Sequence, residues 1–311
     1  CYRLWDEAQT RALVAHGRPE ILDADLASLV LDLAAWGVRT PDGLRFVDPP
    51  PRAAFEEAVA LLKDLDALDG DGAITPEGEA LRRLPLPPRL AHMVHRAAAA
   101  GRGRLAAEIA VVLTERGTGG TSADLRDRVT GLRRDRGKRG ETLKGLARRW
   151  AALAGGAEGD DDVEHCGATV ALAYPDRIAR ARGRDGTFVL ANGRGARLDV
   201  ADRLATEPFL AVAELQGGGA DARILLAAPI GRDEIEADFA AHIIVEDDVR
   251  FEPAAKAVRA RRRRRLGRLV LAEEVLTDPD AEAVAAALVG GIRSLGIECL
   301  PWTKSLRQWR G

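Results

Sequence analysis

Cysteine is scarce in this 311-residue sequence, and aromatic residues make up only 4% of it. The three cysteines, Cys1, Cys166 and Cys299, lie far apart and form no CxxC pair. This pattern argues against a disulfide framework or a structural zinc site, and it predicts a protein of the reducing cytoplasm. The low aromatic content argues against an extensive surface for stacking nucleic-acid bases.

Long apolar runs are also missing. No stretch approaches the roughly 18–20 apolar residues that are needed to span a bilayer, and the polar start does not resemble a signal peptide. We therefore expect no membrane partner. The sequence starts at Cys1 rather than at Met, which predicts that it is a piece of a longer protein.

The sequence has no phosphate-binding loop for ATP. Such a loop needs the pattern GxxxxGK[ST], whose backbone N–H groups and Lys hold the phosphates while Ser or Thr holds Mg²⁺. The only Gly-Lys pair, Gly137-Lys138, is followed by Arg139, and Leu132 stands five residues before Gly137. Asp6-Glu7-Ala8-Gln9 imitates a Walker B motif, but the segment before it is too short and polar for a buried strand. We predict no catalytic residues and no cofactor in this chain.

Metal-ligand patterns are weak. The five histidines include no HExxH motif. His92 and His95 are spaced to share one helix face, which is more typical of half-buried surface histidines than of ligands. Glu164-His165-Cys166 could bind a metal, but nothing that resembles a CxxC pair lies near it in the sequence. We therefore predict no metal site.

Hydrophobic residues make up 46% of the chain, enough for two or three domains with their own cores. Apolar positions 26, 29, 30, 33 and 34 predict one helix, and positions 55, 59, 62 and 65 predict another. The turn Asp69-Gly70-Asp71-Gly72 and the helix start Thr75-Pro76 follow. Together these features predict a winged helix over residues 21–84.

The remaining chain changes from helical to alternating periodicity. Ala-rich apolar stripes predict a helical bundle over residues 85–160. Short strands between Gly-rich turns, at 187–190, 209–213 and 223–226, predict a small barrel over 161–231, of which the OB type is one option. Residues 232–311 mix helix and strand in a small α/β module. The predicted fold class is therefore α+β, in several domains.

Positive charge gathers in two blocks, although the net charge is only -2. The first block spans residues 126–149 and includes Arg133, Arg134 and Arg136. The second comprises Arg259, the run Arg261–Arg265, and Arg268. The planar guanidinium fork suits phosphate, so these blocks are candidates for nucleic-acid binding. A solvated surface that is merely rich in arginine remains an equal alternative.

A Gly-rich turn, Asn192-Gly193-Arg194-Gly195-Ala196-Arg197, is a more specific candidate. Its glycines allow a close approach of backbone to ligand, and Arg194 and Arg197 flank it. An ordinary barrel loop is the alternative interpretation.

These segments, in this order, resemble HrpB-type bacterial DEAH-box helicases over nearly the whole chain. Residues 1–5 are similar to the strand after the last motif of the second RecA-like domain. The resemblance therefore implies that residues 1–20 are the end of that domain and a connector. Other matching segments are Ile21–Leu26 with Leu33–Gly37, Leu68–Gly72 with Thr75–Gly78, Pro88–Met93, Leu113–Arg116, Ala173–Ala179 with Leu190–Ala196, Arg264–Leu271, and Leu300-Pro301-Trp302. The resemblance implies a winged helix, a ratchet-like bundle, an OB region and a C-terminal module.

The resemblance implies a parent ATP-dependent helicase that acts on single-stranded RNA or DNA. Its RecA-like motor domains, with the sites for ATP and Mg²⁺, would precede Cys1 in cis. By position, Arg89, His92, Arg194 and Arg197 would contact the strand, and Tyr174-Pro175-Asp176 would be structural. The alternative is a free-standing nucleic-acid-binding or adaptor module without motor activity.

We expect the isolated chain neither to bind ATP usefully nor to hydrolyse it, because nothing in it can hold the β- and γ-phosphates with Mg²⁺. The measurement is nucleic-acid-stimulated ATPase activity of the purified chain. A signal that co-purifies with the chain and survives Lys138→Ala would contradict this prediction.

Overall fold

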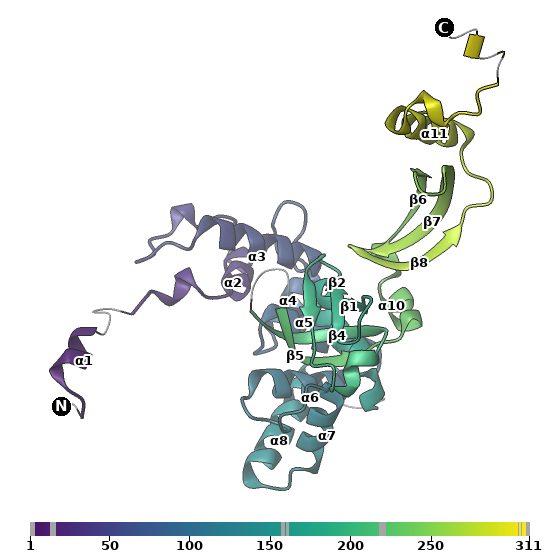
Figure 1. Cartoon of the computed structure of the whole chain (residues 1–311). Coiled ribbons are helices and arrows are strands. Elements are labelled where there is room, and N and C mark those ends of the chain that lie inside the picture. The colour runs from purple at the N-terminus through teal and green to yellow at the C-terminus, as the bar shows by residue number, and fades with distance from the viewer. Residues whose placement is uncertain are drawn as a thin grey trace. The chain divides into compact units, whose positions relative to one another are not determined.

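The computed structural model of the chain describes residues 4–12, 17–156, 159, 162–217, 222–303, 305, 307 and 308. The chain folds into two compact units, which are coloured along the sequence in Figure 1. The first comprises residues 1–119 and 129–162, and the second comprises residues 120–128 and 163–311. Helices dominate the first unit, whereas both sheets lie in the second, so the fold is mixed α+β.

The first helices of unit one have clear start and stop signals. The elements are α1 (Glu7–Ala12), α2 (Ala27–Ala35), α3 (Arg52–Asp64) and α4 (Pro76–Arg82). The carboxylate of Asp25 accepts a hydrogen bond from the N–H of Ala27, at 2.8 Å, at the start of α2. Gly37 ends this helix with φ +79°. The side chain of Thr75 accepts from the N–H of Gly78 and caps α4.

The predicted turn at residues 69–72 is confirmed. Asp69 accepts hydrogen bonds from the N–H groups of Asp71 and Ala73, and Gly72 adopts φ +80°. Leu68 and Ile74 pair across the turn as an antiparallel bridge. The turn therefore forms a short wing between α3 and α4.

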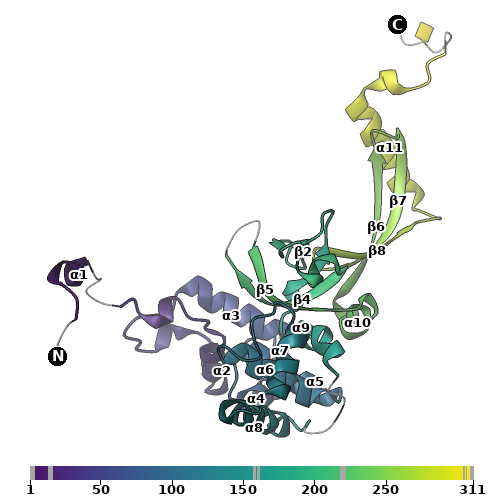
Figure 2. The ribbon, with the colours of Figure 1, turned by 60° about the horizontal axis from the view of Figure 1, so that its bottom comes forward.

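Four further helices make up the bundle: α5 (Pro88–Ala99), α6 (Gly103–Thr114), α7 (Leu125–Arg134) and α8 (Lys138–Leu153). The boundary between the units falls within α7, after Arg128. Leu90, Met93, Val94 and Ala97 form a buried apolar stripe on α5, as expected for the Ala-rich stripes of residues 85–160. Helices α5, α6 and α8 pack against one another, as Figure 2 shows. Burial of this apolar face stabilises the bundle.

The second unit begins with α9 (Cys166–Ala173) and a closed five-stranded barrel. The strands are β1 (Ile178–Ala181), β2 (Thr187–Leu190), β3 (Gly195–Arg197), β4 (Phe209–Gln216) and β5 (Ala222–Pro229). Their order is β1-β2-β3-β5-β4, with β4 pairing back to β1 and β3 running parallel to β5. Inward residues such as Phe188, Leu210 and Ile224 fill the interior. Strands β1 and β3 were not predicted from the sequence, because their pairing with β4 and β5 depends on segments far along the chain.

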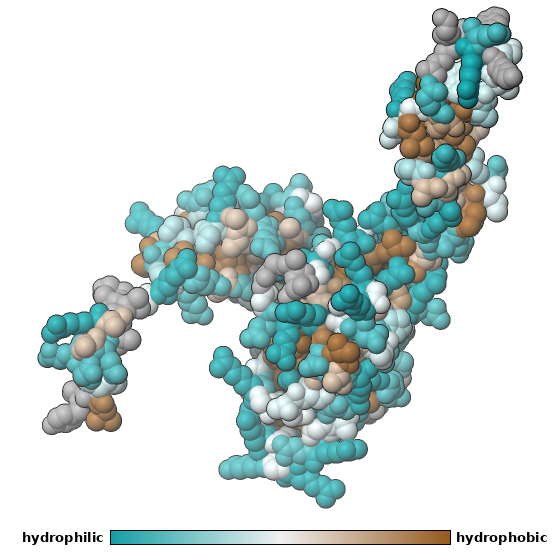
Figure 3. All heavy atoms as spheres, viewed as in Figure 1, coloured by the Kyte–Doolittle hydropathy of each residue, from teal (hydrophilic) through white to brown (hydrophobic). Residues whose placement is uncertain are grey.

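A second sheet follows the helix α10 (Arg232–Asp238). Its strands β6 (Ile243–Glu252), β7 (Ala257–Leu266) and β8 (Leu269–Val275) form an antiparallel sheet in sequence order. The helix α11 (Ala281–Leu295) packs on β6 and β7. Figure 3 shows apolar side chains exposed around α11.

The expected strand at residues 1–5 lies mostly outside the described residues. Leu4 and Trp5, which are described, form a bend and are exposed. None of the helices formed by described residues has the length and apolar character that crossing a membrane requires.

Two helical glycines should respond in opposite ways to Ala. A Cβ at Gly167 in α9 would lie 1.8 Å from the backbone oxygen of Pro229, so Gly167→Ala should lower the thermal midpoint. Gly145 in α8 has nothing within 4 Å of such a Cβ, so Gly145→Ala should stabilise by roughly 0.5–1 kcal/mol through helix propensity. Thermal unfolding of both variants tests this packing. Equal effects of the two substitutions would contradict it.

Candidate nucleic-acid interface

The arginine run of residues 261–265 lies in β7 and is neutralised by carboxylates. Arg262 donates two hydrogen bonds to Asp247, at 2.7 and 2.9 Å. Arg263 lies between Glu273 and Asp248, at 2.7 and 2.8 Å. The other pairs are Arg264 with Glu236, Arg265 with Glu246, and Arg261 with Glu273.

Strand register places Arg262 and Arg263 directly opposite a carboxylate partner, whereas Arg265 reaches Glu246 diagonally. In β6, Asp247 stands opposite Arg262 and Glu246 opposite Arg263, while Glu273 of β8 stands opposite Arg263. Opposite charges on facing strands attract, and like charges there would repel. The run is thus part of a cross-strand ladder, and its guanidinium groups are already occupied. This geometry favours the structural interpretation of the second basic block.

Among the described residues, the first basic block contains both paired and unpaired arginines. Arg133 donates two hydrogen bonds to one oxygen of Glu108, at 2.8 and 2.7 Å, and Glu108 is buried. This arginine therefore holds α7 to α6. Arg134 and Arg136 are exposed. No described residue forms an ion pair with either of them.

The structure places the predicted contacts Arg89 and His92 on α5. Arg89 is half-buried and has an interaction of its own. His92 is 13% exposed, and its Nδ1 lies 3.5 Å from Oε1 of Glu77 on α4. His95 approaches the other oxygen of Glu77 at 3.4 Å. His92, followed by the charges of His95 and Arg96, lowers the pKa of Glu77 although burial opposes this. The two histidines therefore join α4 to α5.

Arg194 and Arg197 are both exposed on the barrel. The Asn192 side chain accepts a hydrogen bond from the N–H of Arg194, which fixes the predicted turn. A Cβ at Gly193 would lie 3.1 Å from Cγ of Arg268, so this glycine is approached by protein rather than left open.

The barrel also places Arg197 beside a residue that sequence reasoning missed. Arg197 of β3 stands directly opposite Arg223 of β5. Thr187 and Gln216 continue the same row on β2 and β4. Both arginines are exposed, and among the described residues neither has an ion-pair partner. Alternation along β5 between buried Ala222, exposed Arg223 and buried Ile224 is the signal that could have identified Arg223.

A buried carboxylate joins residues 120–128 to the barrel. Asp124 is 1% exposed and accepts hydrogen bonds from Arg126 and Arg203, the shortest being 2.8 and 2.6 Å. Burial alone would raise the pKa of Asp124, but the hydrogen bonds from Arg126 and Arg203 together lower it. The Ala227 N–H donates to the oxygen of Ala123 beside it. Asp124 is therefore structural, and Arg203 is engaged.

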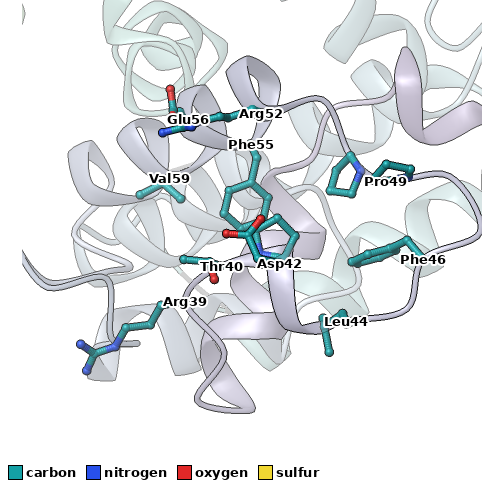
Figure 4. Close-up of a pocket in the computed structure, with 12 residues that line it drawn as sticks. Arg39, Thr40, Asp42, Leu44, Phe46, Pro49, Arg52, Phe55, Glu56 and Val59 are labelled. Carbon is teal, nitrogen blue, oxygen red and sulfur yellow. Dashed lines mark hydrogen bonds and ion pairs between the residues drawn. The ribbon is translucent and has the colours of Figure 1, made fainter.

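A pocket of about 640 Å³ lies between the loop 39–50 and α3 (Figure 4). Phe55, Val59, Leu44 and Phe46 give it apolar walls. Arg52 at its edge pairs with Glu56 one helical turn away, at 2.8 Å. The pocket offers apolar contact without a nucleophile paired to a base. In the described ranges, no group of three or more His, Cys, Asp or Glu residues is arranged to hold a metal ion.

Comparisons with known proteins agree with this architecture. The helicase-associated domain HA2 of the winged-helix type matches residues 58–86. The "ATP-dependent RNA helicase HrpB" of Escherichia coli (strain K12) is 33% identical over 97% of this chain, which spans 36% of that protein. The human "Probable ATP-dependent RNA helicase DHX34" is 40% identical over 86 residues, 28% of this chain and 8% of that protein.

Two solved structures extend the likeness to three dimensions. The crystal structure of the E. coli DExH-box NTPase HrpB superposes with a TM-score of 0.73, at 31% identity, over 98% of this chain. A second crystal structure, of the Escherichia coli DEAH/RHA helicase HrpB, gives 0.72 at 28% identity. The chain spans 37% of each of those proteins.

The winged-helix match and these relatives define a helicase-associated region of the DEAH-box class. Within that class, the chain corresponds along nearly its whole length to the C-terminal region of HrpB-type helicases. It spans little more than a third of those relatives, which also contain parts that have no counterpart in this chain.

The ion pairs of Asp124 with Arg126 and Arg203 should make the free energy of unfolding depend on pH. Because the folded-state pKa of Asp124 is lowered, its stabilising effect is present above about pH 4 and is lost as pH falls below the unfolded value of about 3.9. Asp124→Asn should cost about 3 kcal/mol at neutral pH. Below pH 4, the difference in free energy of unfolding between wild type and Asp124→Asn should become smaller. Denaturant unfolding at a series of pH values measures it.

The control is Asp185→Asn, at an exposed carboxylate of the same unit. It should leave the curve unchanged. If the difference in free energy of unfolding between wild type and Asp124→Asn stays constant down to pH 2, the ion-pair assignment is wrong.

Proposed function

We propose that this chain is the nucleic-acid-binding region of an ATP-dependent helicase and guides single-stranded RNA. The observation that carries the proposal is the adjacent pair Arg197 and Arg223. These two positive side chains stand opposite each other on the barrel surface. In β7, by contrast, the neighbouring arginines have carboxylate partners within the chain. An exposed pair without one, among the residues described, is suited to a phosphate.

The strand order supports assigning the barrel to the OB type. A five-stranded barrel in which β3 pairs with β5, and β1 closes onto β4, has the connectivity of that fold. OB barrels bind oligonucleotides on the face of their second and third strands. The row from Thr187 through Arg197 crosses those two strands. Arg194, in the turn before β3, lies next to this face in the chain.

The chemistry of the row favours the sugar–phosphate backbone over the bases. It consists of Thr187, Arg197, Arg223 and Gln216, and the nearby Phe188 and Phe209 are buried. Stacking platforms present exposed aromatic side chains to successive bases. We therefore expect salt-sensitive binding with little sequence preference.

RNA is proposed as the strand because the E. coli and human relatives are named RNA helicases. The motor role is proposed for RecA-like domains elsewhere in the same polypeptide, with ATP and Mg²⁺ bound there, in the cytoplasm. In the first unit, Arg134 and Arg136 are the further contact candidates, since both are exposed. Arg133 and His92 are proposed to act through packing instead.

A free-standing binding or adaptor module is the second candidate. Its basis is that the chain itself has no GxxxxGK[ST] loop. The DNA upstream of the Cys1 codon distinguishes the two candidates. An in-frame Gly-Lys-Thr loop with a DEAH box supports the helicase, and a nearby start codon supports the adaptor.

Replacing the barrel pair should weaken RNA binding. In Arg197→Gln, Arg223→Gln and the double variant, affinity for a short single-stranded RNA should fall several-fold at low salt. The slope of log K against log salt should decrease by about 0.7 for each phosphate that the variant no longer neutralises. The effects of the two single substitutions on binding free energy should not be additive, because both side chains are proposed to contact the same stretch of phosphates. Fluorescence anisotropy across a salt series measures all of these quantities.

Arg262→Gln is the matched control, since Arg262 is exposed but paired with Asp247. It should leave both affinity and slope near wild type. If Arg262→Gln weakens binding as much as Arg197→Gln does, net charge rather than the barrel face controls binding.

A further inference from the structure

A small basic pocket lies between α6, α7 and α8 of the first unit. Its volume is about 90 Å³. Four basic side chains and one carboxylate surround an alanine floor. The residues that line it are Arg104, Glu108, Arg133, Lys144, Ala147 and Arg148.

The buried carboxylate of Glu108 orients two of these cations. Its Oε2 accepts both hydrogen bonds of Arg133, and its Oε1 lies 3.6 Å from Nε of Arg104. Arg104 and Arg133 come from different helices, yet both are directed toward the same 4%-exposed acid. Their positions are therefore set before any ligand arrives, which lowers the entropy cost of binding.

The remaining two cations come from α8. Lys144 Nζ is held by the backbone oxygen of Asp135 and by Glu141, both at 2.7 Å. Arg148 lies one helical turn later and is exposed. Among the described residues it has no ion-pair partner, although it lines the pocket. Its guanidinium group is thus available to an anion.

The size of the pocket limits the ligand. A water molecule occupies about 30 Å³ in the liquid, so the pocket holds roughly the volume of three waters. That is enough for one phosphoryl group. Arginine suits such a group because its fork donates two parallel hydrogen bonds to phosphate oxygens.

We propose that this pocket binds a single phosphate group of the RNA strand, with Arg148 as the principal contact. Arg104 and Lys144 provide the surrounding positive potential, and Glu108 keeps Arg133 in place. The proposal rests on the proposed function only for the identity of the ligand, because the pocket chemistry would also accept free phosphate. It adds a contact that is separate from the barrel row.

The test compares Arg148→Gln with Arg149→Gln, a neighbouring exposed arginine that does not line the pocket. Both variants lose one positive charge from α8, so net charge is matched, but only Arg148 faces the pocket. Arg148→Gln should weaken single-stranded RNA binding several-fold and reduce the salt slope by about 0.7, whereas Arg149→Gln should have little effect. Inorganic pyrophosphate should raise the thermal midpoint of wild type and Arg149→Gln, but not of Arg148→Gln.

If the two variants behave equally in both assays, the pocket does not bind a phosphate group. Loss of pyrophosphate protection with unchanged RNA affinity would overturn the strand as its ligand and assign a free phosphate instead. If the wild-type chain does not bind RNA, the proposed function fails, and the pyrophosphate comparison decides the pocket by itself. Arg148→Glu is a second variant, and it should have a larger effect than Arg148→Gln in the same direction.

Discussion

Closely spaced guanidinium groups must be neutralised or left facing solvent, and this constraint organises the surface of the protein. Where β7 gathers five arginines in succession, β6, β8 and α10 supply the carboxylates. Each exposed pair contributes little stability by itself, but the ladder prevents repulsion along the strand. Other arginines, such as those at positions 134, 136, 148, 197 and 223, have no such carboxylate partner among the described residues and are exposed to solvent.

Buried carboxylates fix the elements that carry these free cations. Asp124 attaches the segment before α7 to the barrel through Arg126 and Arg203. Glu108 holds Arg133 across the helical bundle. A buried charge of this kind is costly unless it is fully paired, so each pair requires one geometry. The same chemistry that stabilises the two units leaves a defined set of neighbouring arginines unused.

Correspondence to HrpB-type helicases and the described geometry address different questions. The likeness covers nearly all of this chain but little more than a third of the relatives. It therefore gives the architecture of this region alone. The geometry separates engaged basic residues from available ones, a distinction that sequence similarity does not provide. The proposed phosphate contacts rest on this distinction between engaged and available arginines.

Local patterns in the sequence determined much of the secondary structure. The apolar stripe of α5, the Asp-Gly turn at residues 69–72 and the Thr75 cap depend on neighbours within a few residues, so they could be predicted. The short strands β1 and β3 could not, since strand pairing is decided by distant segments. For the same reason, the sequence presented both residues 261–265 and Arg197 as basic candidates, without showing which of them have carboxylate partners. Only the tertiary structure decided between them, because a carboxylate 15 residues away neutralises Arg262 while Arg223 joins Arg197.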